Sequence, residues 1–366
     1  MIIEIDDSIF DNCHNLNADE RFALRDIAIS RRSGVNFVLC SKVKLAKIFD
    51  CLYLDEDVKD VFKKIYSDQT RWHNFLKGFN FRIKLVLEGT SISKKKLGNV
   101  NILCVPLKLF SLYNLNMPPI LIAEDYTDLE FYDLITRSYL KNVGVSSVNF
   151  SYFSLPGGGR NTFRTVKNTY ENRTAISYCI LDSDIEYPSG PIGETARLVE
   201  EVNQGINDNY SRYRIIKGRE VENIIPMSIL FSIIKNKDPL NKLAQLISPD
   251  NNGERAIFFA DFKKGLKRHV ITSKCNMTKS FWQNALKGTD FLVDCNQVKA
   301  TNCSSFKNCN CQLIHGLGTD LLSGVVKHLK SKPFDFTSID DYLIEEWQLL
   351  CQDLSAYMFA PSRIAS

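Results

Sequence analysis

The stretch Tyr178-Cys179-Ile180-Leu181-Asp182-Ser183-Asp184 is an apolar run that ends in two acids one residue apart. A short apolar run bounded by polar residues is typical of a buried strand in a parallel sheet. Open α/β sheets bind their ligands at the carboxyl ends of such strands. Two carboxylates this close repel each other, and a hard divalent cation is their usual partner. If the strand stays extended, Asp182 and Asp184 leave it on one side and form a metal site. The alternative is a solvated acidic turn.

A second strand of the same kind lies upstream. Residues 119–123 are apolar and lead directly into Glu124, and Asp128 falls on the first turn of a helix with apolar residues at spacings of three and four. A short extended piece at 148–150 follows, and then a turn of three glycines, which permit positive φ and close backbone approach. The glycine turn consists of Gly157, Gly158 and Gly159. The order is strand, glutamate, helix, strand, glycine turn, helix, strand and acidic pair.

This order resembles the TOPRIM domain, the metal-dependent catalytic module of topoisomerases, primases and OLD-type nucleases. In that family a glutamate follows the first strand, a glycine turn follows the second and an Asp-x-Asp follows the third. Glu124, Gly157 to Gly159, and Asp182 with Asp184 match these positions, and the resemblance covers about residues 115 to 350. Many members have glycine directly after the glutamate, whereas this chain has Asp125.

Two more stretches are similar to stand-alone TOPRIM nucleases of bacterial anti-phage systems. They are Arg219-Glu220-Val221-Glu222-Asn223-Ile224-Ile225-Pro226 and Phe258-Phe259-Ala260-Asp261-Phe262-Lys263-Lys264-Gly265-Leu266. The resemblance implies a nuclease that hydrolyses DNA or RNA and acts as the toxic effector of such a system. Because the chain contains no Gly-x-x-x-x-Gly-Lys-Ser/Thr motif, the resemblance also implies a regulatory partner such as an ATPase, or a regulated homo-oligomer.

The resemblance implies a catalytic set that holds one or two Mg²⁺ or Mn²⁺ ions. Glu124, Asp182 and Asp184 are its principal acids, and Asp128 and Glu222, or Glu220 in place of Glu222, are further candidate ligands. Lys263 is expected to stabilise charge on the phosphate, as positioned cations do in such sites. Lys264 is expected to be a surface lysine.

Two other function classes stay open. A strand that ends in Asp-x-Asp also marks metal-dependent glycosyltransferases and haloacid-dehalogenase-type phosphatases. The phosphatases require Thr or Val two places after the second Asp, where this chain has Glu186, and the glycosyltransferases do not account for Glu124 or the glycine turn. The other class is a non-catalytic nucleic-acid-binding effector subunit whose acids only bind metal.

A net charge of +4 over 366 residues is nearly neutral, so nucleic-acid binding must depend on local basic patches. We expect Phe258 to Phe262 to form a strand that carries one patch to the edge of the sheet. Lys94 to Lys96 are expected to lie in a solvated loop. Phosphate contacts of this kind carry little sequence preference. The predicted nucleic-acid-binding residues are Arg160, Arg164, Lys264, Lys267 and Arg268.

The chain contains 11 cysteines, which in a cytosolic protein do not indicate a disulfide framework. Isolated cysteines such as Cys13, Cys40 and Cys51 are expected to be small core residues. Cys295 precedes a denser group with a following histidine, whose members are Cys303, Cys309, Cys311 and His315. Thiolates with an imidazole suit structural Zn²⁺, but the spacings are not those of a standard finger. Structural zinc and reduced thiols therefore both remain open for this group.

The sequence as a whole predicts an α/β protein. Residues 1–115 are expected to form a separate N-terminal α/β domain, and 116–350 a TOPRIM-like Rossmannoid parallel sheet with helices on both faces and a C-terminal extension. A C-terminal helix is expected within 338–360, with Trp347 either buried or docking a partner. No apolar run approaches the roughly 20 residues that span a bilayer, so we expect a cytoplasmic protein without a membrane partner.

Overall fold

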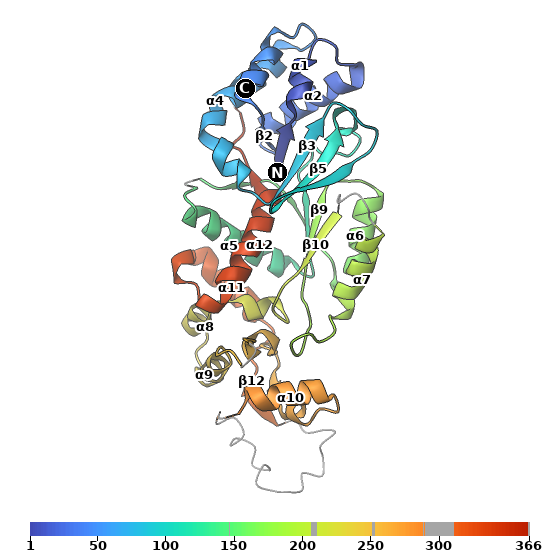
Figure 1. Ribbon diagram of the computed structural model, residues 1–366. Coiled ribbons are helices and arrows are strands. Elements are labelled where there is room, and N and C mark those ends of the chain that lie inside the picture. The colour runs from blue at the N-terminus through green and yellow to red at the C-terminus, as the bar shows by residue number, and fades with distance from the viewer. Residues whose placement is uncertain (146, 206–210, 251–252, 288, 290–310, 365–366) are drawn as a thin grey trace.

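The computed structural model describes residues 1–145, 147–205, 211–250, 253–287, 289 and 311–364 (Figure 1). The predicted α/β class is confirmed, since parallel and mixed sheets alternate with helices along the chain. Figure 1 shows the N-terminal sheet at the top, a second sheet in the middle and a smaller lobe below it.

The N-terminal sheet contains five strands in the order β2 (Phe37–Leu39), β1 (Ile2–Ile5), β3 (Phe81–Val86), β5 (Val100–Pro106) and β4 (Ser93–Leu97). The first four are parallel and β4 is antiparallel to β5. Their connections contain α1 (Asp7–Asp11), α2 (Ala18–Arg32), α3 (Lys42–Leu45), η1 (Ala46–Asp50) and α4 (Glu56–Lys77), and η2 (Leu107–Leu109) follows β5. A capping box of Asn17 and Glu20 begins α2.

The second sheet is four-stranded and entirely parallel, in the order β10 (Ser211–Ile215), β9 (Ser177–Leu181), β6 (Ile120–Ala123) and β8 (Phe153–Pro156). Of these four strands β6 comes first in the chain, and it lies between β8, the second, and β9, the third. This order reverses direction at β6, and ligands of open α/β sheets bind at the carboxyl end of such a switch point.

Helices cover both faces of this second sheet. On one face, Ile122 and Leu181 pack with Val166 of α6 (Thr162–Glu171) and Val199 of α7 (Glu194–Gln204). The other face, which includes Tyr178, packs against α5 (Tyr126–Asn142) and α12 (Ile344–Met358). Each strand in the middle of the sheet is thus buried on both sides, which explains its unbroken apolar sequence.

The strand before the glycine turn differs from the predicted one. Residues 149–150 form β7 (Asn149–Phe150), which pairs antiparallel with β13 (Phe359–Ala360), outside the parallel sheet. The sheet strand is β8, which has one neighbour and an exposed start at Phe153 and Ser154. An edge strand of this kind does not need an apolar run, so its sequence gave no clear signal.

The C-terminal helix α12 joins the two sheets. The Tyr357 ring stacks on Phe81 of β3 and on Tyr178 of β9, with centroids 4.8 and 4.7 Å apart. Trp347 is fully buried, and its indole N–H donates to the carbonyl of Ile224 at 2.7 Å. Trp347 is therefore a core residue and not a partner anchor. Buried side chains of both sheets belong to one continuous hydrophobic core.

The residues between β10 and α12 form the lower lobe and then return to pack beside the second sheet (Figure 1). Residues 258–262 were expected to be a strand, but 258–259 are the end of a buried 3₁₀ helix, η5 (Ala256–Phe259), and 260–262 form a bend and a turn, because the aromatic side chains of this stretch fill the core. This segment contains η4 (Val221–Ile224), α8 (Met227–Ile233), α9 (Asp238–Gln245), β11 (Gly265–Lys267), η6 (Arg268–Thr272), α10 (Asn276–Ala285), β12 (Gln312–His315), α11 (Leu321–Ser331), η8 (Phe336–Ser338) and η9 (Asp341–Leu343). Of these, α11 and η8 pack against α5 beside the second sheet. β11 and β12 pair antiparallel.

Candidate metal centre at the carboxyl ends of β6 and β9

The glycine turn fixes the backbone at Glu124. The N–H of Gly157 donates to the carbonyl of Ala123 at 2.7 Å, and the N–H of Gly158 donates to the carbonyl of Glu124 at 3.1 Å. Gly158 has φ of +76°, which favours glycine, and a Cβ on Gly157 would overlap the hydroxyl of Thr162. The turn predicted from three consecutive glycines therefore holds Glu124 at the end of β6.

Asp128 is held beside Glu124 by the start of α5. The side chain of Asp125 caps the helix by accepting from the N–H of Thr127, and Asp128 accepts from the N–H of Asp125 at 2.9 Å. This reciprocal capping box leaves the Asp128 carboxylate half-buried. Asp125 itself is exposed.

Asp182 and Asp184 do not leave the strand together. Asp182 is half-buried directly after β9, and the buried Ser183 donates from its hydroxyl to the carbonyl of Gly218 at 2.8 Å. Asp184 then adopts a left-handed backbone with φ of +54°, and its side chain lies so close to Gly193 that a Cβ there would overlap it. The extended conformation thus ends before Asp184, whose carboxylate lies at the exposed rim of the site.

The stretches at 219–226 and 258–266 pack against each other. Asn223 donates from its side-chain amide to the carbonyls of Ile257 and Ala260, both at 2.8 Å. The N–H of Arg219 donates to the carbonyl of Phe258 at 2.7 Å, and the carbonyl of Arg219 accepts from the N–H of Asp184 at 2.8 Å. These bonds bring both stretches to the loop that follows β9.

Lys263 enters the site through this packing. Its Nζ lies 3.3 Å from Oε2 of Glu222 and 3.7 Å from Oε2 of Glu220, and Glu222 is only 2% exposed. Neither of these oxygens has a hydrogen bond of normal geometry. Although burial lowers it, the pKa of Lys263 is raised by Glu222, Glu220 and Asp182, so this lysine remains charged.

The carboxylates of the site repel one another. Burial raises the pKa of Glu124, and Asp184 adds to the effect. Burial raises the pKa of Asp128 to about 6, with further repulsion from Asp125 and Glu124. For Asp182, burial and then Asp128 and Glu124 raise the pKa well above its ordinary value. Burial also raises the pKa of Glu220 and Glu222 against the pull of Lys263.

The donor chemistry fits a hard divalent cation, but the spacing is wider than in a formed site. Carboxylate oxygens are the ligands that Mg²⁺ and Mn²⁺ take in proteins. Among the described residues, no three acids of this site have oxygens that all lie within 4.8 Å of one another. Neighbouring carboxylates repel one another when ionised, and a bound cation would remove that repulsion. The residues able to hold it are Glu124, Asp128, Asp182, Asp184 and Glu222.

The predicted nucleic-acid-binding residues lie in two regions. Arg160, in η3 (Gly159–Asn161), is exposed and forms an ion pair with Glu194 at 2.9 Å. Arg164 is exposed on α6, next to the glycine turn. The second group surrounds β11 on the lower lobe, not an edge of the parallel sheet, and consists of the exposed Lys264 and the half-buried Lys267 and Arg268.

The predicted Cys/His zinc group lies largely outside the described residues. Cys295, Cys303 and Cys309 fall in the range 290–310. Cys311 directly precedes β12 and is half-buried, and His315 is exposed at the end of β12.

Sequence reasoning missed three features. Arg219 lies 3.7 Å from Glu186 and 3.9 Å from Asp261, and links the loop after β9 to the stretch that carries Lys263. Cys13 and His14, adjacent in the chain, are brought close to the distant Cys51 within residues 1–115. A cavity of about 660 Å³ also lies within residues 1–115, lined by residues that include Asp6, Ser41, His73 and Lys84. No acid of the candidate metal centre lines this cavity, and the centre is identified by its converging charges instead of by volume.

Comparison with protein-family models, curated proteins and solved structures found no match to this chain. Over the described residues, none of the helices is both long and apolar enough to span a lipid bilayer.

Proposed function

We propose that this chain is a metal-dependent nuclease of the TOPRIM type. Three features support the proposal: the parallel sheet with its first strand between the second and the third, Glu124 at the end of that first strand, and Asp182 at the end of the third. The glycine turn that hydrogen-bonds to Glu124 is the fourth element of the same pattern.

The observation that carries the proposal is the excess of buried negative charge around Lys263. Glu124, Asp128, Asp182, Glu220 and Glu222 converge on this lysine from separate segments, and the pKa of every one of these acids is raised. A structural ion-pair network normally matches its charges, because an unmatched buried charge costs several kcal/mol. Raised pKa values at the carboxyl end of a switch point are typical of a functional site.

The residues of the site have distinct roles in this proposal. Glu124, Asp128 and Asp182 hold Mg²⁺ or Mn²⁺, with Asp184 and Glu222 as further ligands. A bound ion would polarise the phosphodiester and lower the pKa of a coordinated water. Lys263, held by Glu222 and Glu220, places a positive charge where the phosphate oxygens gain negative charge.

The substrate class follows from the basic residues at the site's edges. Arg160 and Arg164 beside the glycine turn, and Lys264, Lys267 and Arg268 around β11, contact the sugar-phosphate backbone of DNA or RNA without reading bases. In this proposal the nuclease is the toxic effector of an anti-phage system, restrained by a regulatory ATPase or by homo-oligomer formation.

The test is cleavage of plasmid, single-stranded DNA and total tRNA by the purified chain, with Mg²⁺, with Mn²⁺ and with EDTA. We expect metal-dependent cleavage by the wild type and a loss of at least about a hundredfold in Asp182→Asn. The matched control is Asp320→Asn, because Asp320 is exposed and makes no side-chain capping bond to α11. Cleavage that persists in Asp182→Asn would exclude the assigned centre. Metal-dependent binding without cleavage of any of these substrates would favour the non-catalytic effector subunit.

A further inference from the structure

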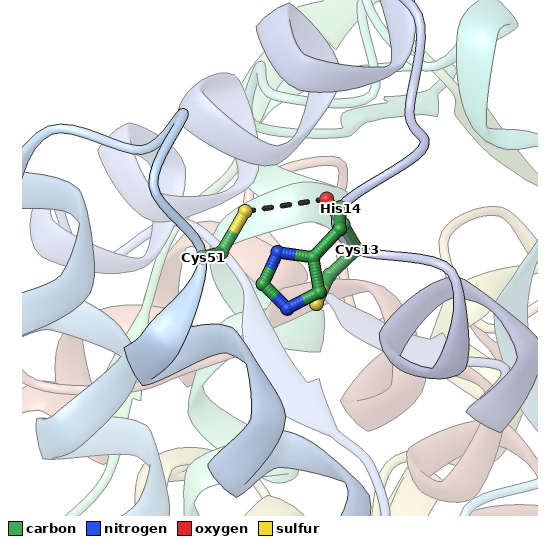
Figure 2. A group of neighbouring side chains, drawn as sticks. All are labelled: Cys13, His14 and Cys51. Atoms are coloured by element: carbon green, nitrogen blue, oxygen red, sulfur yellow. Dashed lines mark hydrogen bonds between the residues drawn. The ribbon is translucent and has the colours of Figure 1, made fainter.

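Two cysteines and a histidine meet at the carboxyl-end side of the N-terminal sheet, in a different part of the molecule from the acidic centre. Cys13 and His14 follow α1, and Cys51 follows η1 (Figure 2). One donor atom from each residue lies within 4.8 Å of the other two. Figure 2 shows the three side chains turned toward one another.

The two segments that carry these residues are held together by ion pairs of Asp11, which do not involve the proposed ligands, and by hydrogen bonds of the two thiols. Asp11 pairs with Lys44 at 2.8 Å and with Lys47 at 2.6 Å. The Cys13 thiol donates to the carbonyl of Lys47 at 3.6 Å, and the Cys51 thiol donates to the carbonyl of Cys13 at 3.2 Å. The donor atoms are therefore brought together by the fold itself.

Two thiolates and an imidazole form a donor set for a thiophilic cation. Zinc takes Cys sulfur at about 2.3 Å and His nitrogen at about 2.0 Å, so tetrahedral donors lie roughly 3.5–3.8 Å apart. The donor atoms of Cys13, His14 and Cys51 lie at most 4.8 Å apart, so each distance needs to shorten by only about 1 Å to match a zinc site. Cys13 and Cys51 are buried at 2% and 1% exposure, whereas His14 is exposed.

We propose that Cys13, His14 and Cys51 bind one Zn²⁺, with solvent as the fourth ligand. On binding, the two thiols lose their protons to solvent and the neutral imidazole donates a lone pair, so the bound group of two thiolates and Zn²⁺ has no net charge. The ion fastens the turn after α1 to the turn after η1. This site is distinct from the Cys303 to His315 group and from the acidic centre.

The test is the zinc content and zinc affinity of the full chain, measured by elemental analysis and by competition with a chromophoric chelator. Because Cys275 is exposed and Cys311 belongs to the other candidate group, the measurements are made in a Cys275→Ser/Cys311→Ser background. Cys51→Ser and His14→Ala are the test variants. Cys104→Ser is the matched control, because Cys104 is also a buried free thiol within residues 1–115 but lies in β5, outside the cluster of Cys13, His14 and Cys51.

We expect Cys51→Ser to lose one equivalent of zinc and His14→Ala to bind it at least about tenfold more weakly, with Cys104→Ser unchanged. Because His14 is exposed, its variant tests the site even if Cys51→Ser fails to fold. With Co²⁺ in place of zinc, thiolate-to-metal charge-transfer absorption should appear and should be lost in Cys51→Ser. Equal zinc content and affinity in all variants would overturn the proposal, as would a Cys13–Cys51 disulfide in protein purified under reducing conditions.

Discussion

Asp128→Asn should stabilise the protein in the absence of metal. Burial and neighbouring acids raise the pKa of Asp128 from 3.8 to about 6, so ionising it costs more in the folded than in the unfolded state. A shift of about two units corresponds to roughly 3 kcal/mol, at 1.36 kcal/mol per unit. Asparagine is uncharged and can still accept the hydrogen bond from the N–H of Asp125. We therefore expect a gain of about 2 kcal/mol in the free energy of unfolding at pH 7.5.

The stability gain of Asp128→Asn should depend on pH. Because the folded pKa is raised, the stabilisation from protonated Asp128 is present below about pH 4 and is lost as the pH rises through about 6. The gain in Asp128→Asn should accordingly be near zero at pH 4 and reach its full value above pH 7. The difference between variant and wild type is the quantity to compare, since the buried amino group of Met1, with its pKa lowered to about 5, adds an opposite dependence to both proteins.

The assay is urea unfolding in EDTA between pH 4 and 8, followed by circular dichroism. Asp125→Asn is the matched control, because Asp125 is exposed and asparagine is also a good N-cap; its stability should stay within about 0.5 kcal/mol. Excess Mg²⁺ should stabilise the wild type more than Asp128→Asn. The reasoning is refuted if Asp128→Asn is no more stable than the wild type at pH 7.5, or if its gain does not change with pH.

Three further experiments test the packing and charge of the molecule. Gly157→Ala should lower the free energy of unfolding by about 1–3 kcal/mol, because the new Cβ would overlap the hydroxyl of Thr162. Gly159→Ala should lower it by about 1 kcal/mol, because only the positive φ of Gly159 opposes a side chain there. Equal unfolding free energies of the two variants would contradict this. Trp347→Ala should cost about 3–5 kcal/mol in urea unfolding and leave the mass by light scattering unchanged, and a change of oligomeric state alone would restore its interface role. Lys263→Met should slow single-turnover cleavage at low salt by about a hundredfold, while Lys264→Met, exposed in the wild type, should change it little; equal effects would leave Lys263 a diffuse electrostatic role.

The parts of the fold that the sequence predicted are those buried on both faces. β6 and β9 are short apolar runs because helices cover both sides of the sheet, and their ends placed Glu124 and Asp182 correctly. The exposed edge strand β8 lacks this pattern. The stretch at 258–262 is apolar because it fills the core around a 3₁₀ helix, and such a run does not by itself distinguish strand from helix.

The parts of the site that could not be predicted depend on contacts between distant segments. The turn of Asp184 away from the strand follows from its backbone bond to Arg219 and its contact with Gly193. The pairing of Lys263 with Glu222 follows from hydrogen bonds of Asn223, which sequence spacing does not reveal. The Cys13 and Cys51 pairing likewise joins residues 38 apart in the chain.

The most direct test of the acidic centre is anomalous diffraction from crystals soaked in Mn²⁺. The account predicts a manganese peak in bonding contact with the carboxylates of Glu124 and Asp182, at about 2.0–2.3 Å, and its loss in Asp182→Asn. A manganese peak elsewhere, or none at a concentration that supports cleavage, would contradict it.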